Sequence, residues 1–154
     1  MAKRKKVPGK SSEYGLENYT HPDLFGKWLG YEIVRFDRKK LAAEVSLKLR
    51  ADHLSPAQRV HGGVISALFD YSSGAAVFAS LKPKDFCSTV ELKVNYLLPL
   101  YLGDTVRTIS KVIFRGKRLC VIHSFLYRNA EKRPSAMATA TFNVGTASRA
   151  LGRD

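Results

Sequence analysis

The spacing of apolar residues changes twice along this chain, and these changes limit the folds that it can adopt. Between residues 31 and 50 apolar and polar residues alternate, as in LAAEVSLKL, which is the period of a strand with one buried face. Residues 62–81 are apolar nearly all round, so we expect a buried helix of about five turns there. Alternation then returns between residues 88 and 144. The chain therefore predicts two strands, one long helix and four more strands.

The four later runs are STVELKVNYLL, DTVRTISKVIF, LCVIHSFLYR and SAMATATFNV, and their short connections carry turn residues. We expect them to form an antiparallel meander, with Thr89 on the face opposite Leu92 and Val94. A helix that covers one face of an antiparallel sheet of about six strands gives an α+β fold, with the sheet wrapped around the central helix. A short helix over HPDLFGKWLG precedes the first strand.

The long helix has one stripe of small or polar residues, formed by Ser66, Asp70, Ser73 and Gly74. Because the sheet covers only part of the helix, we expect a homodimer in which helix ends or sheet edges of two subunits meet.

The length of 154 residues fits one domain, which we place at residues 18–146, between a basic, disordered tail at 1–17 and a C-terminal tail at 147–154. No apolar run is long enough to cross a membrane and the start lacks a secretory signal, so we expect a cytoplasmic protein without membrane insertion. The two cysteines are too isolated for a disulfide framework, and the histidines lack ligand spacing, so we expect no metal site.

The net charge of +13 predicts a polyanionic partner, either nucleic acid, membrane headgroups or a phosphorylated small molecule. No helix-turn-helix segment precedes the fold, and no aromatic-with-basic RNA-binding motif occurs in the sequence. Of the possible modes of nucleic-acid binding, only nonspecific binding to phosphates remains.

Three motifs in this order carry a resemblance to a known family: FGKWLG before the first strand, VHGGVISALFD at the start of the long helix, and STVELKVNYLLPLYLGDTV after it. Between about Trp28 and Val144 the chain resembles the PaaI-like hotdog-fold acyl-CoA thioesterases. The resemblance implies hydrolysis of an acyl-CoA thioester at a site shared by two subunits. The dimers of this family often pair into tetramers. Coenzyme A is then part of the substrate, and no cofactor is implied.

The resemblance also implies roles for four residues. Asp70 matches the catalytic carboxylate, which acts as a general base for water or as a nucleophile. Gly62 matches the residue whose backbone N–H polarises the thioester carbonyl, and Thr89 matches a hydroxyl close to the acid. His61 matches a histidine that shapes the turn and contacts the thioester, although a purely structural bond at the helix start is an equal alternative.

One position departs from the family pattern. Ser55 stands where the family often has an asparagine that holds substrate or water, and a hydroxyl cannot replace both the donor and the acceptor of an amide. Gln58 is the nearby residue expected to compensate.

The chemistry of thioester hydrolysis fits these residue types. Negative charge builds on the carbonyl oxygen, and a helix N-terminus with Gly62 and Gly63 offers free N–H groups that a substrate can approach closely. Asp70 lies roughly 13 Å further along the helix axis than His61, because each residue rises about 1.5 Å. We therefore expect the N–H donors and the acid of one site to come from different subunits.

Basic residues near the RGK turn are expected to hold the phosphates of coenzyme A, with a solvated hairpin turn as the equal alternative. They are Lys111, Arg115, Lys117 and Arg118.

Three other functions compete with the hydrolase. An acyl-CoA-binding sensor without catalysis is favoured by Ser55 and disfavoured by Asp70. A nonspecific nucleic-acid-binding protein agrees only with the net charge. A hotdog dehydratase requires a different arrangement of histidine and acid from the one found here.

Overall fold

The structure of the protein, a computed structural model, describes residues 22–83 and 85–146. The two predicted tails, residues 1–17 and 147–154, and the first four residues of the predicted domain lie outside the described residues. Within the described residues, no helix is long and apolar enough to cross a membrane.

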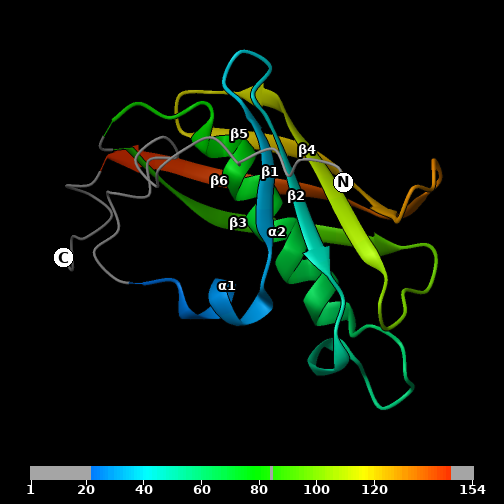
Figure 1. Cartoon of the computed structure of the whole chain (residues 1–154). Helices are drawn as coiled ribbons and strands as arrows, with labels where there is room; N and C mark the ends of the chain where they lie inside the picture. Colours follow the sequence, from blue (N-terminus) through cyan, green and yellow to red (C-terminus); the bar gives the residue numbers. More distant parts are fainter. Residues whose placement is uncertain (1–21, 84, 147–154) are drawn as a thin grey trace, which may run out of the picture.

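Two strands, one long helix and four strands follow one another in the predicted order (Figure 1). A short helix precedes them. In chain order the elements are α1 (Leu24–Leu29), β1 (Glu32–Asp37), β2 (Ala42–Lys48), the 3-10 turn η3 (Ala51–His53), α2 (Gly62–Phe78), β3 (Asp85–Tyr96), β4 (Thr105–Arg115), β5 (Leu119–Arg128) and β6 (Pro134–Thr146).

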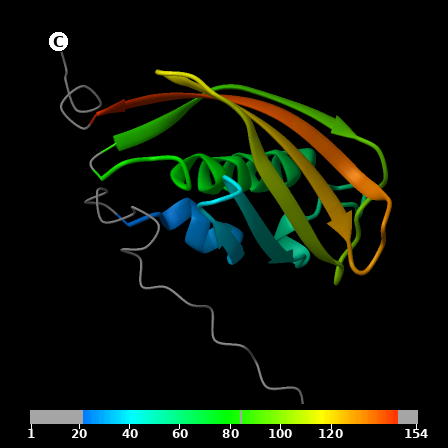
Figure 2. The same cartoon turned by 90° about the horizontal axis from the view of Figure 1, so that it is seen from above.

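The strands form one antiparallel sheet in the order β1-β2-β4-β5-β6-β3. The sheet curves around α2, with β1 and β2 on one side of the helix and the other four strands arched over it (Figure 2). This is the predicted architecture of a sheet wrapped around a central helix.

The predicted meander is correct for β4, β5 and β6 and wrong for β3, which pairs with β6 at the edge of the sheet. The connection after β3 is not a tight turn. It passes under the start of α2, where Leu100 is buried and its carbonyl accepts a hydrogen bond from the Val60 N–H at 3.0 Å. This path carries the chain from the edge of the sheet to the position between β2 and β5.

The core lies between α2 and the concave face of the sheet. Strand β2 supplies alternating inward residues, as its LAAEVSLKL pattern predicted, and α2 buries apolar side chains over most of its length. The largest fully buried apolar side chains include Leu47, Val45, Leu68, Phe69, Val77, Leu100, Val106, Ile122 and Leu126.

Strand β3 contains a bulge that changes which of its residues face the helix. The pairing with β6 shifts between Thr89 and Glu91, so Val90 is an extra residue, and it is 60% exposed. Beyond the bulge Leu92 packs against the core, and before it Thr89 turns toward α2. The alternation that placed Thr89 on the face opposite Leu92 and Val94 therefore does not hold across the bulge, because strict alternation does not survive an inserted residue.

Helix α1 is fixed to the start of β1 and to the turn before α2. Asp23 caps it by accepting a hydrogen bond from the Gly26 N–H at 2.8 Å, and Gly30 ends it in the left-handed conformation at φ 79°. The Arg50 guanidinium donates to the carbonyls of Trp28 and Leu29, the latter at 2.9 Å. These contacts hold Asp23 beside α2, where it becomes part of the site.

Candidate active site

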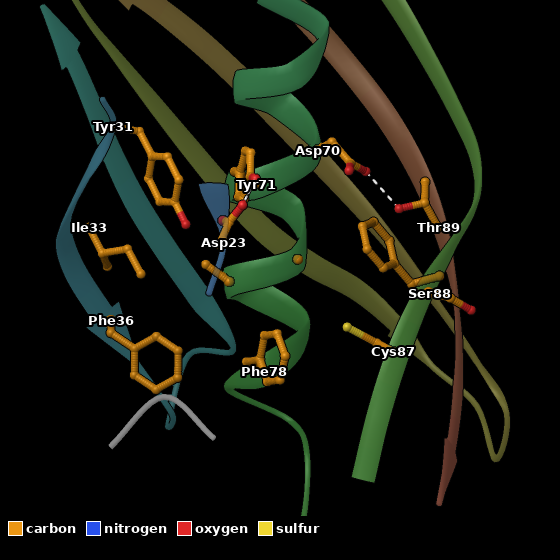
Figure 3. A pocket seen from close by; sticks show the side chains of 13 residues that line it. Asp23, Tyr31, Ile33, Phe36, Asp70, Tyr71, Phe78, Cys87, Ser88 and Thr89 are labelled. Atoms are coloured by element: carbon orange, nitrogen blue, oxygen red, sulfur yellow. Dashed lines mark hydrogen bonds between the residues drawn. The ribbon is translucent and has the colours of Figure 1, made fainter. Parts of the chain in front are cut away.

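A pocket of about 490 Å³ lies along α2, between the two edges of the curved sheet. One wall comes from β1 together with Asp23 and Tyr31, which flank α1; the opposite wall comes from β3, and α2 forms the floor (Figure 3). The pocket is lined by Asp23, Tyr31, Ile33, Phe36, Asp70, Tyr71, Gly74, Ala75, Phe78, Cys87, Ser88, Thr89 and Phe142.

Asp70 and Thr89 meet on the β3 side of this pocket. The Thr89 hydroxyl donates a hydrogen bond of 2.7 Å to Asp70 Oδ1, which is drawn as a dashed line in Figure 3. Among the described residues Asp70 makes no other hydrogen bond, so its carboxylate keeps unused acceptor capacity facing the pocket. The structure thus brings together two residues that the sequence singled out and that lie 19 positions apart.

A polar wall opposite β3 was not anticipated from the sequence. The Tyr71 hydroxyl donates a hydrogen bond of 2.7 Å to Asp23 Oδ1, and the rings of Tyr31 and Tyr71 lie with their centroids 4.3 Å apart. Burial, reinforced by the negative charge of Asp23, raises the pKa of Tyr31 to about 12, so this phenol stays neutral. Burial and the hydrogen bond to Asp23 also raise the pKa of Tyr71.

His61 caps the N-terminus of α2. The Nδ1 atom of its side chain accepts a hydrogen bond from the Gly63 N–H at 2.9 Å. The neighbouring Gly62 N–H is at the first helical position, where no intrahelical acceptor exists, and it has no partner among the described hydrogen bonds. Of the two glycines, Gly62 is therefore the one with a free donor.

Tyr96 covers this helix end and was also missed in the sequence. Its hydroxyl lies 2.6 Å from Ser66 Oγ and donates to the Gly62 carbonyl at 3.3 Å. Gly62 is backed by the Tyr96 ring, since a Cβ on this glycine would lie 3.5 Å from that ring. Tyr96 is at the end of β3 and 53% exposed, a position that the alternating pattern assigned to the sheet rather than to the site.

Asp70 and the Gly62 N–H are eight residues apart on one helix, which separates them by about 12 Å along the axis. A single carbonyl group cannot contact both from within one chain. Strand β3, which carries Thr89, is an edge of the sheet among the described strands.

Ser55 and Gln58 lie in the loop before α2 and line neither this pocket nor the basic pocket described below. The Ser55 carbonyl accepts a hydrogen bond from the Gln58 N–H at 2.9 Å, and Gln58 adopts a positive φ of 58°. The exposed Gln58 side chain makes no contact with Asp70 among the described hydrogen bonds.

Three of the four predicted phosphate-binding residues line a second pocket, which lies at the start of β3 and the end of β6. Arg115, Lys117 and Arg118 line it, and so does Lys82, which was not singled out in the sequence. Lys111 does not belong to it, because Lys111 lies within β4, exposed and opposite His123.

The two pockets share the β3 residues Cys87 and Ser88. Burial raises the pKa of the Cys87 thiol to about 12, so this cysteine lines the boundary between the pockets as a neutral group. Within residues 22–83 and 85–146, no three side chains of the metal-binding types come together.

Comparison with known proteins adds a family match. The model of the Thioesterase superfamily matches residues 57–134. A Caenorhabditis elegans protein named "Putative esterase F42H10.6" is 30% identical over 108 residues, which are 70% of this chain and 62% of that protein. The chain thus spans less than two thirds of the nematode relative.

Solved structures share the fold. The E. coli PaaI protein from the phenylacetic acid degradation operon has a TM-score of 0.73 at 21% identity, over 87% of this chain and 95% of that one. The smu.793 protein of Streptococcus mutans UA159, solved with bound acetyl CoA, has a TM-score of 0.68 at 25% identity, over 76% of this chain and 90% of that one. The predicted PaaI-like hotdog fold is confirmed.

Proposed function

The chain belongs to the thioesterase superfamily, and from this premise we propose that it hydrolyses acyl-CoA thioesters with Asp70 as the catalytic carboxylate. The observation that carries the proposal is the 2.7 Å hydrogen bond from Thr89 to Asp70 in a mainly apolar pocket. A carboxylate held by one donor and otherwise open to an acyl-sized pocket can act on a bound thioester. The acetyl CoA bound by the Streptococcus mutans relative supports the same ligand class.

The reaction requires two groups on opposite sides of the thioester. The Gly62 N–H donates to the carbonyl oxygen and stabilises the negative charge that develops there. Asp70 either removes a proton from the attacking water or attacks the carbonyl carbon itself. In the first route water adds to the carbonyl carbon, the C–S bond breaks and coenzyme A leaves as the thiol with the proton that Asp70 had removed. In the second route the C–S bond breaks as an anhydride forms between Asp70 and the acyl group, and water then cleaves this anhydride, which releases the acid and restores Asp70.

A dimer completes the site in this proposal. Because Gly62 and Asp70 of one chain are about 12 Å apart along α2, the donor of one subunit works with the acid of its partner. The open edge of β3 supports this arrangement, since two edge strands can pair and so bring both copies of Thr89 to the interface.

The basic pocket is assigned to the phosphates of coenzyme A. Arg115, Lys117 and Arg118 provide positive charge there, and the shared residues Cys87 and Ser88 connect this pocket to the acyl pocket. The proposed substrate thus has its charged end at the sheet terminus and its acyl group along α2.

A free-thiol assay with short, aromatic and long acyl-CoAs tests the activity. The Asp70→Asn variant should lose about 10²- to 10⁴-fold in kcat, the usual contribution of an acid–base group, while its thermal unfolding stays close to that of the wild type. Asp52→Asn, an exposed aspartate on η3, is the matched control and should retain full activity. Equal turnover by Asp70→Asn would overturn the role of Asp70, and binding of coenzyme A without hydrolysis would support the sensor.

Subunit mixing tests the shared site. Asp70→Asn and Gly62→Pro subunits are each inactive alone, but a mixed dimer keeps one intact site out of two. After random exchange about a quarter of wild-type activity should return, because half of the dimers are mixed and each has one working site. Activity that stays at the level of the separate variants would show that both groups act within one chain.

A further inference from the structure

The acyl pocket has the opposite charge from the rest of the chain. The chain carries a net charge of +13, yet the pocket lining contains two carboxylates, Asp23 and Asp70, and no lysine, arginine or histidine. Asp70 faces β3, whereas Asp23 enters from the opposite wall beside Tyr31 and Tyr71 (Figure 3). The proposed hydrolysis uses only Asp70, so Asp23 has no role in it.

Asp23 has acceptor capacity left after its structural contacts. Its Oδ1 atom accepts from the Tyr71 hydroxyl at 2.7 Å and from the Gly26 N–H at 2.8 Å. The Oδ2 atom lies next to Gly26 and makes no hydrogen bond among the described residues, so the carboxylate keeps lone pairs that are not used. A carboxylate can only accept hydrogen bonds, and two oxygens offer about four lone pairs. A ligand group that donates a hydrogen bond can therefore be received here.

The surroundings of Asp23 favour such a group over a hydrocarbon end. Phe36, Phe78 and Phe142 contribute apolar surface to the rest of the pocket, whereas Asp23 itself is exposed to solvent. A methyl terminus placed against Asp23 would remove water from the carboxylate without replacing its hydrogen bonds, which is unfavourable. A protonated amine or a hydroxyl would replace them, and an amine would also be attracted by the faces of the aromatic rings.

We propose that this pocket selects acyl groups whose far end carries a hydrogen-bond donor, an ammonium or a hydroxyl group, and that Asp23 receives this donor. The inference rests on the proposed acyl-CoA specificity and adds the chemical class of the acyl group. Asp23 is then a specificity residue, since it touches the substrate far from the thioester and takes no part in bond breaking.

Coenzyme A thioethers test this inference separately from the hydrolysis, because they lack the carbonyl group and cannot be cleaved. The S-heptyl, S-(6-hydroxyhexyl) and S-(6-aminohexyl) thioethers have the same number of heavy atoms in the alkyl chain and differ only at its end. Calorimetry should give a dissociation constant about 10-fold lower for at least one donor ligand than for the heptyl ligand, the size expected of a charged hydrogen bond. The better of the two donor ligands identifies the terminal group.

The Asp23→Asn variant provides the matched test, because asparagine also caps helices and can still accept from Gly26 and Tyr71. The preference for the better donor ligand over the heptyl ligand should fall to about 2-fold or less in this variant, while heptyl binding is retained. Asp52→Asn is the control and should keep the wild-type preference.

Three outcomes would overturn the inference: equal affinities of the wild type for all three thioethers, no binding of any of them, or a donor preference that survives in Asp23→Asn. Hydrolysis of heptanoyl-CoA by the wild type, followed by free thiol, tests the proposed function independently. The wild-type ligand series decides the preference even if Asp23→Asn is poorly folded.

Discussion

Helix α2 carries polar residues on two sides, and the burial and hydrogen bonding of these residues differ between the sides. Toward the sheet, Ser72 lies 2.7 Å from Ser110, Ser110 lies 2.6 Å from Ser124, and Ser124 lies 3.1 Å from Ser73. These four hydroxyls are buried and form an open chain of hydrogen bonds between α2, β4 and β5, with Ser72 and Ser73 at its two ends. Toward the pocket, Asp70 has a single partner and is partly open to solvent.

The difference separates polar groups that stabilise the fold from polar groups that can act on a ligand. A buried hydroxyl that bonds another buried hydroxyl contributes to folding and is closed off from a substrate. Asp70 and the Gly62 N–H keep unused bonding capacity where a pocket or a helix end is exposed. Burial of the polar groups, rather than polarity itself, distinguishes the two sides of α2.

After the loss expected of Asp70→Asn, the largest effect should come from removing the free N–H of Gly62. Proline is favoured at the first helical position, and His61 already has the extended conformation that precedes proline, at ψ 136°. Gly62→Pro should thus keep the helix but lower kcat by about 10²- to 10³-fold, as expected for an oxyanion donor. Gly62→Ala keeps the N–H, and its Cβ would meet Tyr96 at an ordinary 3.5 Å, so it should remain active. Steady-state kinetics decide this, and equal losses in both variants would contradict a role of the N–H.

On the sheet side the effect should be on stability instead. Ser124→Ala removes the central partner of Ser110 and Ser73 and leaves buried hydroxyls incompletely bonded, which should lower the free energy of unfolding by about 1–3 kcal/mol. The variant should keep the wild-type kcat. Urea unfolding and the free-thiol assay measure the two effects. A Ser124→Ala variant with normal stability and impaired turnover would reverse the proposed division between the two sides.

Thr89 combines features of the stabilising and the ligand-facing polar groups, because it is exposed but its hydroxyl already donates to Asp70. Thr89→Ala should lower kcat by about 10-fold, the value of one hydrogen bond to a charged group, and should change stability little. Thr89→Ser retains the hydroxyl and should recover most of the activity. If the serine variant were as slow as the alanine variant, the methyl group rather than the hydrogen bond would be responsible.

Local periodicity predicted the elements of this fold well and their pairing less well. Alternation gave the strands and the apolar stretch gave α2, because both patterns reflect which residues face one core. The position of β3 depends on the path of the loop at residues 97–104 under α2, and no local pattern encodes that path. The orientation of Thr89 depends on the bulge at Val90, which is set by pairing with β6.

The candidate site was predicted where a motif carried it. Asp70, Gly62 and Thr89 were selected by resemblance, and the structure places Asp70 and Thr89 in contact, whereas their catalytic roles stay predictions. Asp23 was missed because it reaches Tyr71 across 48 positions of sequence. The single polar stripe expected on α2 was also wrong: Ser73 is fully buried and bonds Ser124, so it belongs to the sheet side.

The smallest effect should come from His53, a buried group whose partners are incomplete. Its Nδ1 accepts from the Arg50 N–H at 3.3 Å, but Nε2 has no hydrogen-bond partner among the described residues. Burial, and then the positive charge of Arg50, lower the pKa of His53 below its usual 6.5, and they outweigh the Leu29 carbonyl and the Asp52 carboxylate, which act in the opposite direction. The unfolded chain thus takes up a proton before the folded chain does, and the folded state loses stability as the pH falls below about 6.5.

His53→Asn keeps an acceptor but cannot be protonated, so its destabilisation relative to the wild type should be smaller at about pH 5 than at about pH 7 in urea unfolding. The exposed His123→Asn is the control, and a pH dependence equal in all three proteins would show that His53 does not titrate differently on folding.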